Sequence, residues 1–282
     1  MAENQENIFK KIDVKVFDKF IDKFAQKYVE QRNALRPKTI DEMLKASEAL
    51  GSDFDLSQIK TIVQQNSVFI DPIREKGGTP NPVNDIYRSD LGELLTTYYF
   101  EEKLDESYRY IIPAKNISTR ERYDMPGRGI DAIGYRIKDD GTTYELLVSE
   151  AKVSGQKQNP PAVVDQTDDS IYKTQKNYHD NSDVLIQRLV EFSKNLQGQD
   201  LIAICCVIVD VKNKTNKCDI TYGCGLIRDY TCVDETKDFG KMQSHANEFS
   251  PGNIHFVILS FTEKTIDSTI DLFYKKVREL TK

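Results

Sequence analysis

The stretch GRGIDAIGYRIKDDGTTYELLVSEAK, residues 127–152, decides the fold of this chain. It contains two apolar segments, residues 129–137 and 143–151, separated by Asp140-Gly141. An Asp-Gly pair between two such segments is typical of a tight β-hairpin turn. The stretch therefore predicts two antiparallel strands joined by a hairpin.

Four residues of this hairpin carry chemistry. Side chains two apart on a strand point the same way, so Glu150 and Lys152 share one face while Ala151 points to the other. The hairpin brings Asp131, near the start of the first strand, alongside them. Two carboxylates and the backbone carbonyl of Ala151 form an all-oxygen site suited to Mg²⁺ or Mn²⁺, and an adjacent ammonium suits an attacking water and a phosphate. The pattern predicts a metal-dependent phosphodiesterase.

An acidic residue two positions before a lysine is common here, because 30% of the residues are charged. The same spacing occurs, for example, at residues 101–103 and 210–212. What distinguishes Glu150 is its place at the end of an apolar strand, where an acidic pair is costly to keep without a metal or a cation. The alternative is an ordinary ion pair between Glu150 and Lys152 at a strand edge, with Asp131 in a turn.

Helical and strand patterns surround the hairpin. The expected elements are helices at residues 89–104, 183–196 and 263–280, and further strands at residues 108–112, 201–210 and 254–261. A crossover helix between two strands predicts a parallel pair at the centre of a mixed sheet. Residues 201–210, LIAICCVIVD, are almost wholly apolar, as expected for a strand covered on both faces. The sequence therefore predicts an α/β fold, with a mixed β-sheet sandwiched by helices.

The first eighty residues are expected to form a helical region. An apolar stripe with helical spacing is formed by Phe17, Phe20, Ile21, Phe24 and Tyr28. Two more helices are expected, one ending at Gly51 and one opening at Asp55. A break rich in glycine and proline at residues 75–82 follows. We therefore expect residues 1–80 to bind a partner or to cap the core, and residues 81–282 to form the domain that contains the hairpin.

Composition limits the classes of function. The chain has 282 residues, and 39 Lys+Arg against 45 Asp+Glu give a net charge of −6, so any DNA contact must be a local patch or the work of a partner. No apolar run is long enough to span a bilayer, and the polar amino terminus does not resemble an export signal. Five cysteines without a CxxC pair fit reduced thiols. A cytoplasmic location is expected.

The GID motif at residues 129–131, the EAK triplet at residues 150–152 and the order of elements resemble the PD-(D/E)XK nuclease superfamily over roughly residues 89–261. The resemblance implies a restriction-endonuclease-like core and a Mg²⁺- or Mn²⁺-dependent deoxyribonuclease. It implies that Asp131 and Glu150 bind the metal and that Lys152 positions or activates water. Ile130 stands where the name pattern has proline, a frequent variation.

Many members of this superfamily also place a glutamate after a glycine in the helix before the first strand. Gly92-Glu93 matches that position, so the resemblance implies that Glu93 is catalytic. Helical periodicity places Glu93 opposite the apolar stripe of its helix, so a glutamate on a solvated face is the alternative.

More narrowly, RSDLGELL at residues 88–95, GIDAIGY at residues 129–135 and the terminal SEAK at residues 149–152 are similar to the HamA-type nuclease subunit of Hachiman anti-phage defence systems. That resemblance implies an effector that degrades DNA when a large helicase partner, HamB, senses an abnormal DNA state. A restriction-type endonuclease and a non-catalytic subunit that retains the nuclease fold are the alternatives.

Basic residues gather in the segment between the first two predicted strands. Lys115, Arg120, Arg122 and Arg128 lie there in an otherwise acidic chain, and arginines near a metal site are suited to holding phosphates. We therefore expect them to contact the DNA backbone. The alternative is a solvated loop.

Overall fold

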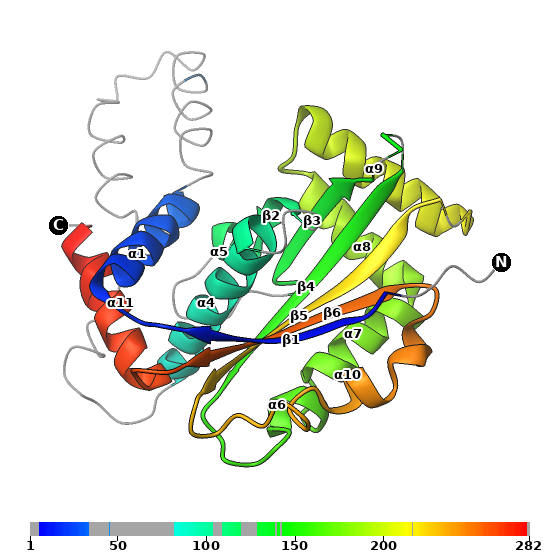
Figure 1. Cartoon of the computed structure of the whole chain (residues 1–282). Coiled ribbons are helices and arrows are strands. Elements are labelled where there is room, and N and C mark those ends of the chain that lie inside the picture. Colours follow the sequence, from blue (N-terminus) through cyan, green and yellow to red (C-terminus); the bar gives the residue numbers. More distant parts are fainter. Residues whose placement is uncertain are drawn as a thin grey trace.

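A six-stranded mixed β-sheet forms the centre of the molecule (Figure 1). The computed structural model describes residues 6–33, 45, 82–103, 109–119, 129–138, 140–141, 143–215 and 217–280. The strands lie side by side in the order β1-β6-β5-β4-β3-β2. Their bounds are β1 Ile8–Val14, β2 Ile111–Lys115, β3 Ala132–Ile137, β4 Tyr144–Ser154, β5 Asp219–Asp229 and β6 Asn253–Phe261. The predicted α/β class is confirmed.

The predicted hairpin is confirmed as β3 and β4. The two strands are antiparallel, with Ala132 opposite Ser149 and Ile137 opposite Tyr144. On its other side β4 pairs with β5 in parallel, and β6 and β1 continue the parallel half of the sheet. A parallel pair therefore lies at the centre, as predicted, but its second strand is β5 and not the expected residues 201–210. At one edge, β2 begins at Ile111, three residues later than the sequence pattern indicated.

Helices cover both faces of this sheet (Figure 1). One face carries α1, α4, α11 and the short α5, and the other carries α6 to α10. Their bounds are α1 Asp18–Asn33, α4 Pro82–Tyr98, α5 Asn116–Thr119, α6 Ala162–Asp165, α7 Ile171–Asp180, α8 Ser182–Ser193, α9 Gly198–Asn213, α10 Gly240–Ser244 and α11 Ile266–Leu280. A π-helical turn, Tyr99–Lys103, continues α4, and a 3₁₀ turn, Ala246–Phe249, precedes β6. No helix in these ranges combines the length and apolar character needed to cross a bilayer.

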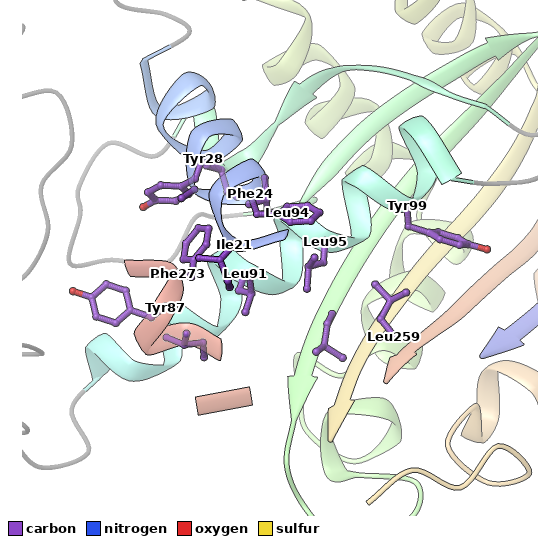
Figure 2. Close-up of a cluster of buried hydrophobic side chains, with 14 of the residues drawn as sticks. Ile21, Phe24, Tyr28, Tyr87, Leu91, Leu94, Leu95, Tyr99, Leu259 and Phe273 are labelled. Atoms are coloured by element: carbon purple, nitrogen blue, oxygen red, sulfur yellow. The ribbon is translucent and has the colours of Figure 1, made fainter. Parts of the chain in front are cut away.

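The aromatic stripe of α1 lies largely in the core. Figure 2 shows Phe24 and Tyr28 converging with Leu91 of α4 and Phe273 of α11. The rings of Tyr28 and Phe273 meet edge to face at 5.5 Å. Phe17, at the start of the stripe, is exposed. The helix thus fastens the amino-terminal segment to the sheet layer formed by the rest of the chain.

Glycines let α4 approach the sheet closely. A Cβ at Gly223 would lie 2.6 Å from Leu147 Cδ1 and 3.0 Å from Phe100 Cζ. A Cβ at Gly225 would overlap the side chain of Thr96. Any larger residue at either position in β5 would push α4 away from the sheet. These glycines and the polar ends of residues 219–229 hid β5 from the sequence pattern.

The predicted strand at residues 201–210 is wrong, because this segment lies in helix α9. Ala203, Ile204, Val207 and Asp210 are buried with helical spacing. Apolar residues also occupy the outer face, where Ile202 is 53% exposed and Val209 is 58% exposed. These exposed apolar residues make the segment continuously apolar. The helical spacing of its buried residues therefore cannot be recognised in the sequence. Cys205 and Cys206, which a strand covered on both faces would bury, are exposed as well.

The helical prediction for residues 1–80 also needs correction. Residues Ile8–Val14 form β1, an edge strand of the central sheet parallel to β6. The helix predicted from the aromatic stripe is confirmed as α1. The expected helices at residues 39–50 and after Asp55, and the proposed boundary near residue 80, lie outside the described residues.

Candidate active site

The two predicted acidic residues meet where β3 begins. Ala132 pairs with Ser149, so one further step of the antiparallel register places Asp131 opposite Glu150. The backbone N–H of Ala151 donates a hydrogen bond of 2.7 Å to Oδ2 of Asp131. Because β3 pairing stops here while β4 continues to Ser154, the Asp131 carboxylate replaces the missing strand partner. The juxtaposition predicted from the hairpin is present.

Glu150 is a buried acid in a strained electrostatic position. Its exposed fraction is 4%, and burial together with the neighbouring charge of Asp131 raises its pKa to about 8, although Lys152 opposes the rise. Its Oε2 atom is buried and has no hydrogen-bond partner among the described residues. A buried carboxylate oxygen without a donor is unfavourable unless a cation or water meets it.

Lys152 lies between two acids. Its Nζ is 3.0 Å from Oε1 of Glu150 and 3.3 Å from Oδ2 of Asp169, in the loop before α7. Burial lowers the pKa of Lys152, but the charges of Glu150 and Asp131 more than offset this, so its pKa is raised and it stays cationic. The ion pair of the alternative interpretation does exist. It lies on β4 inside the sheet, however, and not on an edge strand.

This donor set fits a hard divalent cation. In a strand, the N–H and C=O of one residue point toward the same side, so the Ala151 carbonyl points to the Asp131 side as its N–H does. Two carboxylates and this carbonyl are the oxygen donors that Mg²⁺ and Mn²⁺ accept. Within the described ranges, no group of three or more acidic, histidine or cysteine side chains is suited to a metal, at this site or at any other. Such a cation would therefore keep several waters, as Mg²⁺ usually does.

Glu93 is buried, so the solvated-face alternative is wrong for this residue. Its exposed fraction is 2%, and Oε1 accepts a hydrogen bond of 3.1 Å from the Ser89 hydroxyl. A Cβ at the preceding Gly92 would lie 2.7 Å from Val153 Cγ2, on the face of β4 opposite to Glu150. The structure thus places Glu93 beside the strand of the triplet, and its catalytic role stays a prediction.

The predicted phosphate contacts are only partly described. Lys115 ends β2, and its Nζ is 2.6 Å from Oε1 of Glu101 while also donating to the carbonyl of Ile112 at 2.9 Å. These contacts engage Lys115 within the protein. Arg120, Arg122 and Arg128 lie outside the described residues.

Helix α7 contributes residues that the sequence pattern missed. The Gln175 amide donates to the carbonyls of Val148 and Gly223, both at 3.0 Å, and so joins β4 to β5 just before Glu150. Tyr178 is buried one turn later. No helix was predicted between residues 152 and 183, but buried Ile171, Gln175 and Tyr178 have the i, i+4, i+7 spacing of a helix face, which the sequence did contain.

Comparison with known proteins adds one match. The HamA family model matches residues 3–277, and therefore nearly all of the chain, including every strand of the sheet and all four residues of the hairpin site. No curated protein matches the sequence.

Proposed function

Because this chain belongs to the HamA family, we propose that it is a metal-dependent deoxyribonuclease, the effector subunit of a Hachiman anti-phage defence complex with a helicase partner. The family associates the chain with antiviral defence. The observation that carries the proposed chemistry is the acidic pair with one buried member: Asp131 is held by the Ala151 amide opposite the buried Glu150, with Lys152 3.0 Å from Glu150.

The groups around the acidic pair would have different roles in hydrolysis. Asp131, Glu150 and the Ala151 carbonyl would hold Mg²⁺ or Mn²⁺, which supplies a Lewis acid for the phosphoryl oxygen and lowers the pKa of a bound water. The Ala151 N–H fixes the Asp131 carboxylate, so the acid needs little reorganisation on binding. Burial around Glu150 excludes bulk water and strengthens the electrostatic interactions there.

Lys152 is suited to orient the attacking water. Its ammonium remains charged beside two carboxylates and therefore donates hydrogen bonds without acting as a base. With a cation held at Glu150, the Lys152 ammonium would be available to a water or to the developing negative charge on the phosphate. Asp169, whose side chain is exposed, holds the other side of the ammonium from the loop.

The acidic chain argues for delivery of DNA by a partner. At a net charge of −6 the whole molecule repels a polyanion, and local basic groups must overcome that repulsion. A helicase that captures DNA would supply the missing attraction and would also restrain an enzyme that reads no long sequence. Neither the partner nor the restraint is needed for the acidic site itself to be assembled.

The deciding experiment compares the full chain alone and co-expressed with the helicase from the neighbouring gene. Plasmid, linear and single-stranded DNA are incubated with Mg²⁺, Mn²⁺ or EDTA, with and without ATP. We expect metal-dependent degradation that is lost in Glu150→Gln and kept in Asp168→Asn, which changes an exposed acid near the site. Cleavage that survives Glu150→Gln would refute the site. A complex that binds DNA and never cleaves it would favour the non-catalytic alternative, and rapid sequence-specific cutting by the chain alone would favour a restriction enzyme.

A further inference from the structure

An arginine from α8 lies against the start of the hairpin. Gly129 has a φ of +100°, and a Cβ there would lie 3.2 Å from Nε and 3.3 Å from Cζ of Arg188. The guanidinium therefore rests on the backbone two residues before Asp131. Glycine at 129 permits both the left-handed conformation and this close contact.

The same arginine lies on the face of β4 that carries Glu150 and Lys152. Tyr178 of α7 is buried on this face, and burial raises its pKa to about 12. The charges of Glu150 and Asp131 contribute to this rise of the Tyr178 pKa, whereas those of Arg188 and Lys152 oppose it. One buried ring thus senses both the acidic pair and Arg188.

Arg188 has donors to spare. Its Nη1 donates to Oε2 of Glu191 at 2.8 Å, and this is its one recorded hydrogen bond to the described residues. A guanidinium carries five N–H donors, so Nη1 and Nη2 keep N–H groups that no described residue accepts. The side chain of Arg188 is 33% exposed, so solvent reaches part of it. A surface ion pair with Glu191 alone does not explain why the Nε edge rests on the hairpin.

We infer that Arg188 binds a phosphate of the DNA backbone next to the bond that Asp131 and Glu150 position for cleavage, an inference that rests on the proposed function. A guanidinium edge matches two oxygens of a phosphodiester, and such charge-assisted contacts are strong. Lys152 and Arg188 then flank the acidic pair on two sides. Arg188 fixes where the backbone lies, and Glu191 holds its guanidinium in place from the solvent side.

The test measures DNA binding by the full chain in the Glu150→Gln background, which prevents cleavage, with labelled single-stranded and duplex oligonucleotides at several salt concentrations. We expect Arg188→Gln to weaken binding about five- to tenfold and to reduce the slope of log affinity against log salt by about 0.7 to 0.9, the loss of one phosphate contact. Arg188→Lys keeps the charge and should restore the slope with only part of the affinity. Arg88→Gln, which removes an arginine paired with the exposed Asp267 and not used by this proposal, is the matched control and should leave the slope unchanged.

The outcomes separate this inference from the proposed function. An Arg188→Gln variant with wild-type affinity and slope overturns the phosphate contact, even where the otherwise unmodified chain cleaves DNA. A variant that binds more weakly at an unchanged slope, with Arg188→Lys no better, assigns Arg188 a purely structural role and also overturns it. Absence of DNA binding and of Glu150-dependent cleavage in the wild-type chain, alone and with the helicase, would instead contradict the proposed function.

Discussion

The amide of Ala151 holds the carboxylate of Asp131 at 2.7 Å, so the middle residue of the Glu-Ala-Lys triplet positions the acid of the neighbouring strand. The same contact occupies the position at which strand pairing would otherwise continue past Ala132 and Ser149. The hairpin thus ends in a carboxylate rather than in another ladder hydrogen bond. The Asp131 side chain thus accepts the hydrogen bond of the Ala151 N–H and also supplies a carboxylate to the site.

Replacing Asp131 with asparagine should separate these two requirements. The amide oxygen of Asp131→Asn still accepts the hydrogen bond from Ala151, so the free energy of unfolding should change by less than about 1 kcal/mol. The lost charge removes a metal ligand, and Mg²⁺-dependent cleavage should fall by at least about 100-fold. Asp131→Ala loses both the charge and the hydrogen-bond acceptor, so it should in addition be less stable than Asp131→Asn. Thermal unfolding measures the change in stability, and a plasmid cleavage assay measures the change in activity. Full activity in Asp131→Asn would contradict the proposed role of Asp131 as a metal ligand.

Metal binding should become tighter as the pH rises toward 8. Burial and the charge of Asp131 raise the pKa of Glu150 to about 8, so the group is largely protonated below that pH and must lose its proton to bind a cation. The apparent affinity for Mn²⁺ should rise about tenfold per pH unit between pH 6 and 8, with release of a proton. Calorimetric titration in two buffers of different ionisation enthalpy measures both quantities. A pH-independent affinity would contradict this prediction, and Glu150→Gln should abolish the effect.

The same group should make the metal-free protein less stable at higher pH. Between the ordinary pKa of 4.5 and the folded-state value of about 8, the folded protein holds the Glu150 proton while the unfolded chain has lost it. Unfolding then releases a proton, so raising the pH favours unfolding by up to a few kcal/mol over this window. Urea unfolding in EDTA at pH 5 and pH 8 should show the loss in the wild-type chain and a smaller one in Glu150→Gln.

The arrangement of the residues at the site could be predicted from the sequence because its signals are local. Asp140-Gly141 specifies a turn, and the turn fixes the register that brings Asp131 to Glu150. Periodicity likewise predicted α1 and α11, whose apolar and polar faces are distinct. Arg188 and Gln175 were missed, because a single polar residue on a helix reveals its role only when the helix is packed against the sheet.

Strand β5 and helix α9 could not be predicted, because their sequences lack the alternation of apolar and polar residues that identifies a strand or a helix. Strand β5 carries Gly223 and Gly225 because α4 presses on it, and glycines weaken any strand signal. Helix α9 has apolar residues on its exposed face, including Ile202 and Val209, so its sequence resembles a strand buried on both sides. In both cases the deciding interaction involves residues distant in the sequence.

Two isoleucines of α9 test this correction directly. Ile202 and Ile204 would share one face of a strand, but on the helix Ile204 is buried and Ile202 is 53% exposed. Ile204→Ala should therefore cost about 2–4 kcal/mol of unfolding free energy, and Ile202→Ala less than about 0.5 kcal/mol. Denaturant unfolding of both variants gives the comparison. Equal losses at the two positions would support the strand instead.

Close packing of α4 on the triplet strand should be visible in a double-mutant cycle. A Cβ at Gly92 would lie 2.7 Å from Val153 Cγ2, so Gly92→Ala should destabilise the fold by about 1–3 kcal/mol despite the better helix propensity of alanine. Val153→Ala removes the obstructing methyl group and should recover part of this loss in the double variant. A coupling free energy near zero would show that α4 has room to move. Gly92 would then not be required for the packing of α4, and so of Glu93, against β4.

The last prediction concerns the buried arginine that anchors the loop after the triplet. Arg228 on β5 is fully buried with Asp238 at 3.1 Å, and its guanidinium also donates to the carbonyls of Ser154 and Gln156 at 3.1 and 2.6 Å. Arg228→Met leaves the Asp238 charge buried and these carbonyls without donors, so it should cost about 3–5 kcal/mol.

The exposed pair of Arg88 and Asp267 provides the matched control for Arg228, because it is also an arginine–carboxylate pair, at 2.7 Å. Arg88→Met should cost less than about 1 kcal/mol, since water solvates the remaining acid. Arg228→Lys should lie between the two, because an ammonium has three donors and no planar fork to reach the acceptors on both sides. Urea unfolding ranks the variants, and hydrogen exchange in residues 155–161 should increase first in those of Arg228. If Arg228→Met were as stable as Arg88→Met, the loop that leads from Lys152 to Asp169 would have to be held by other contacts.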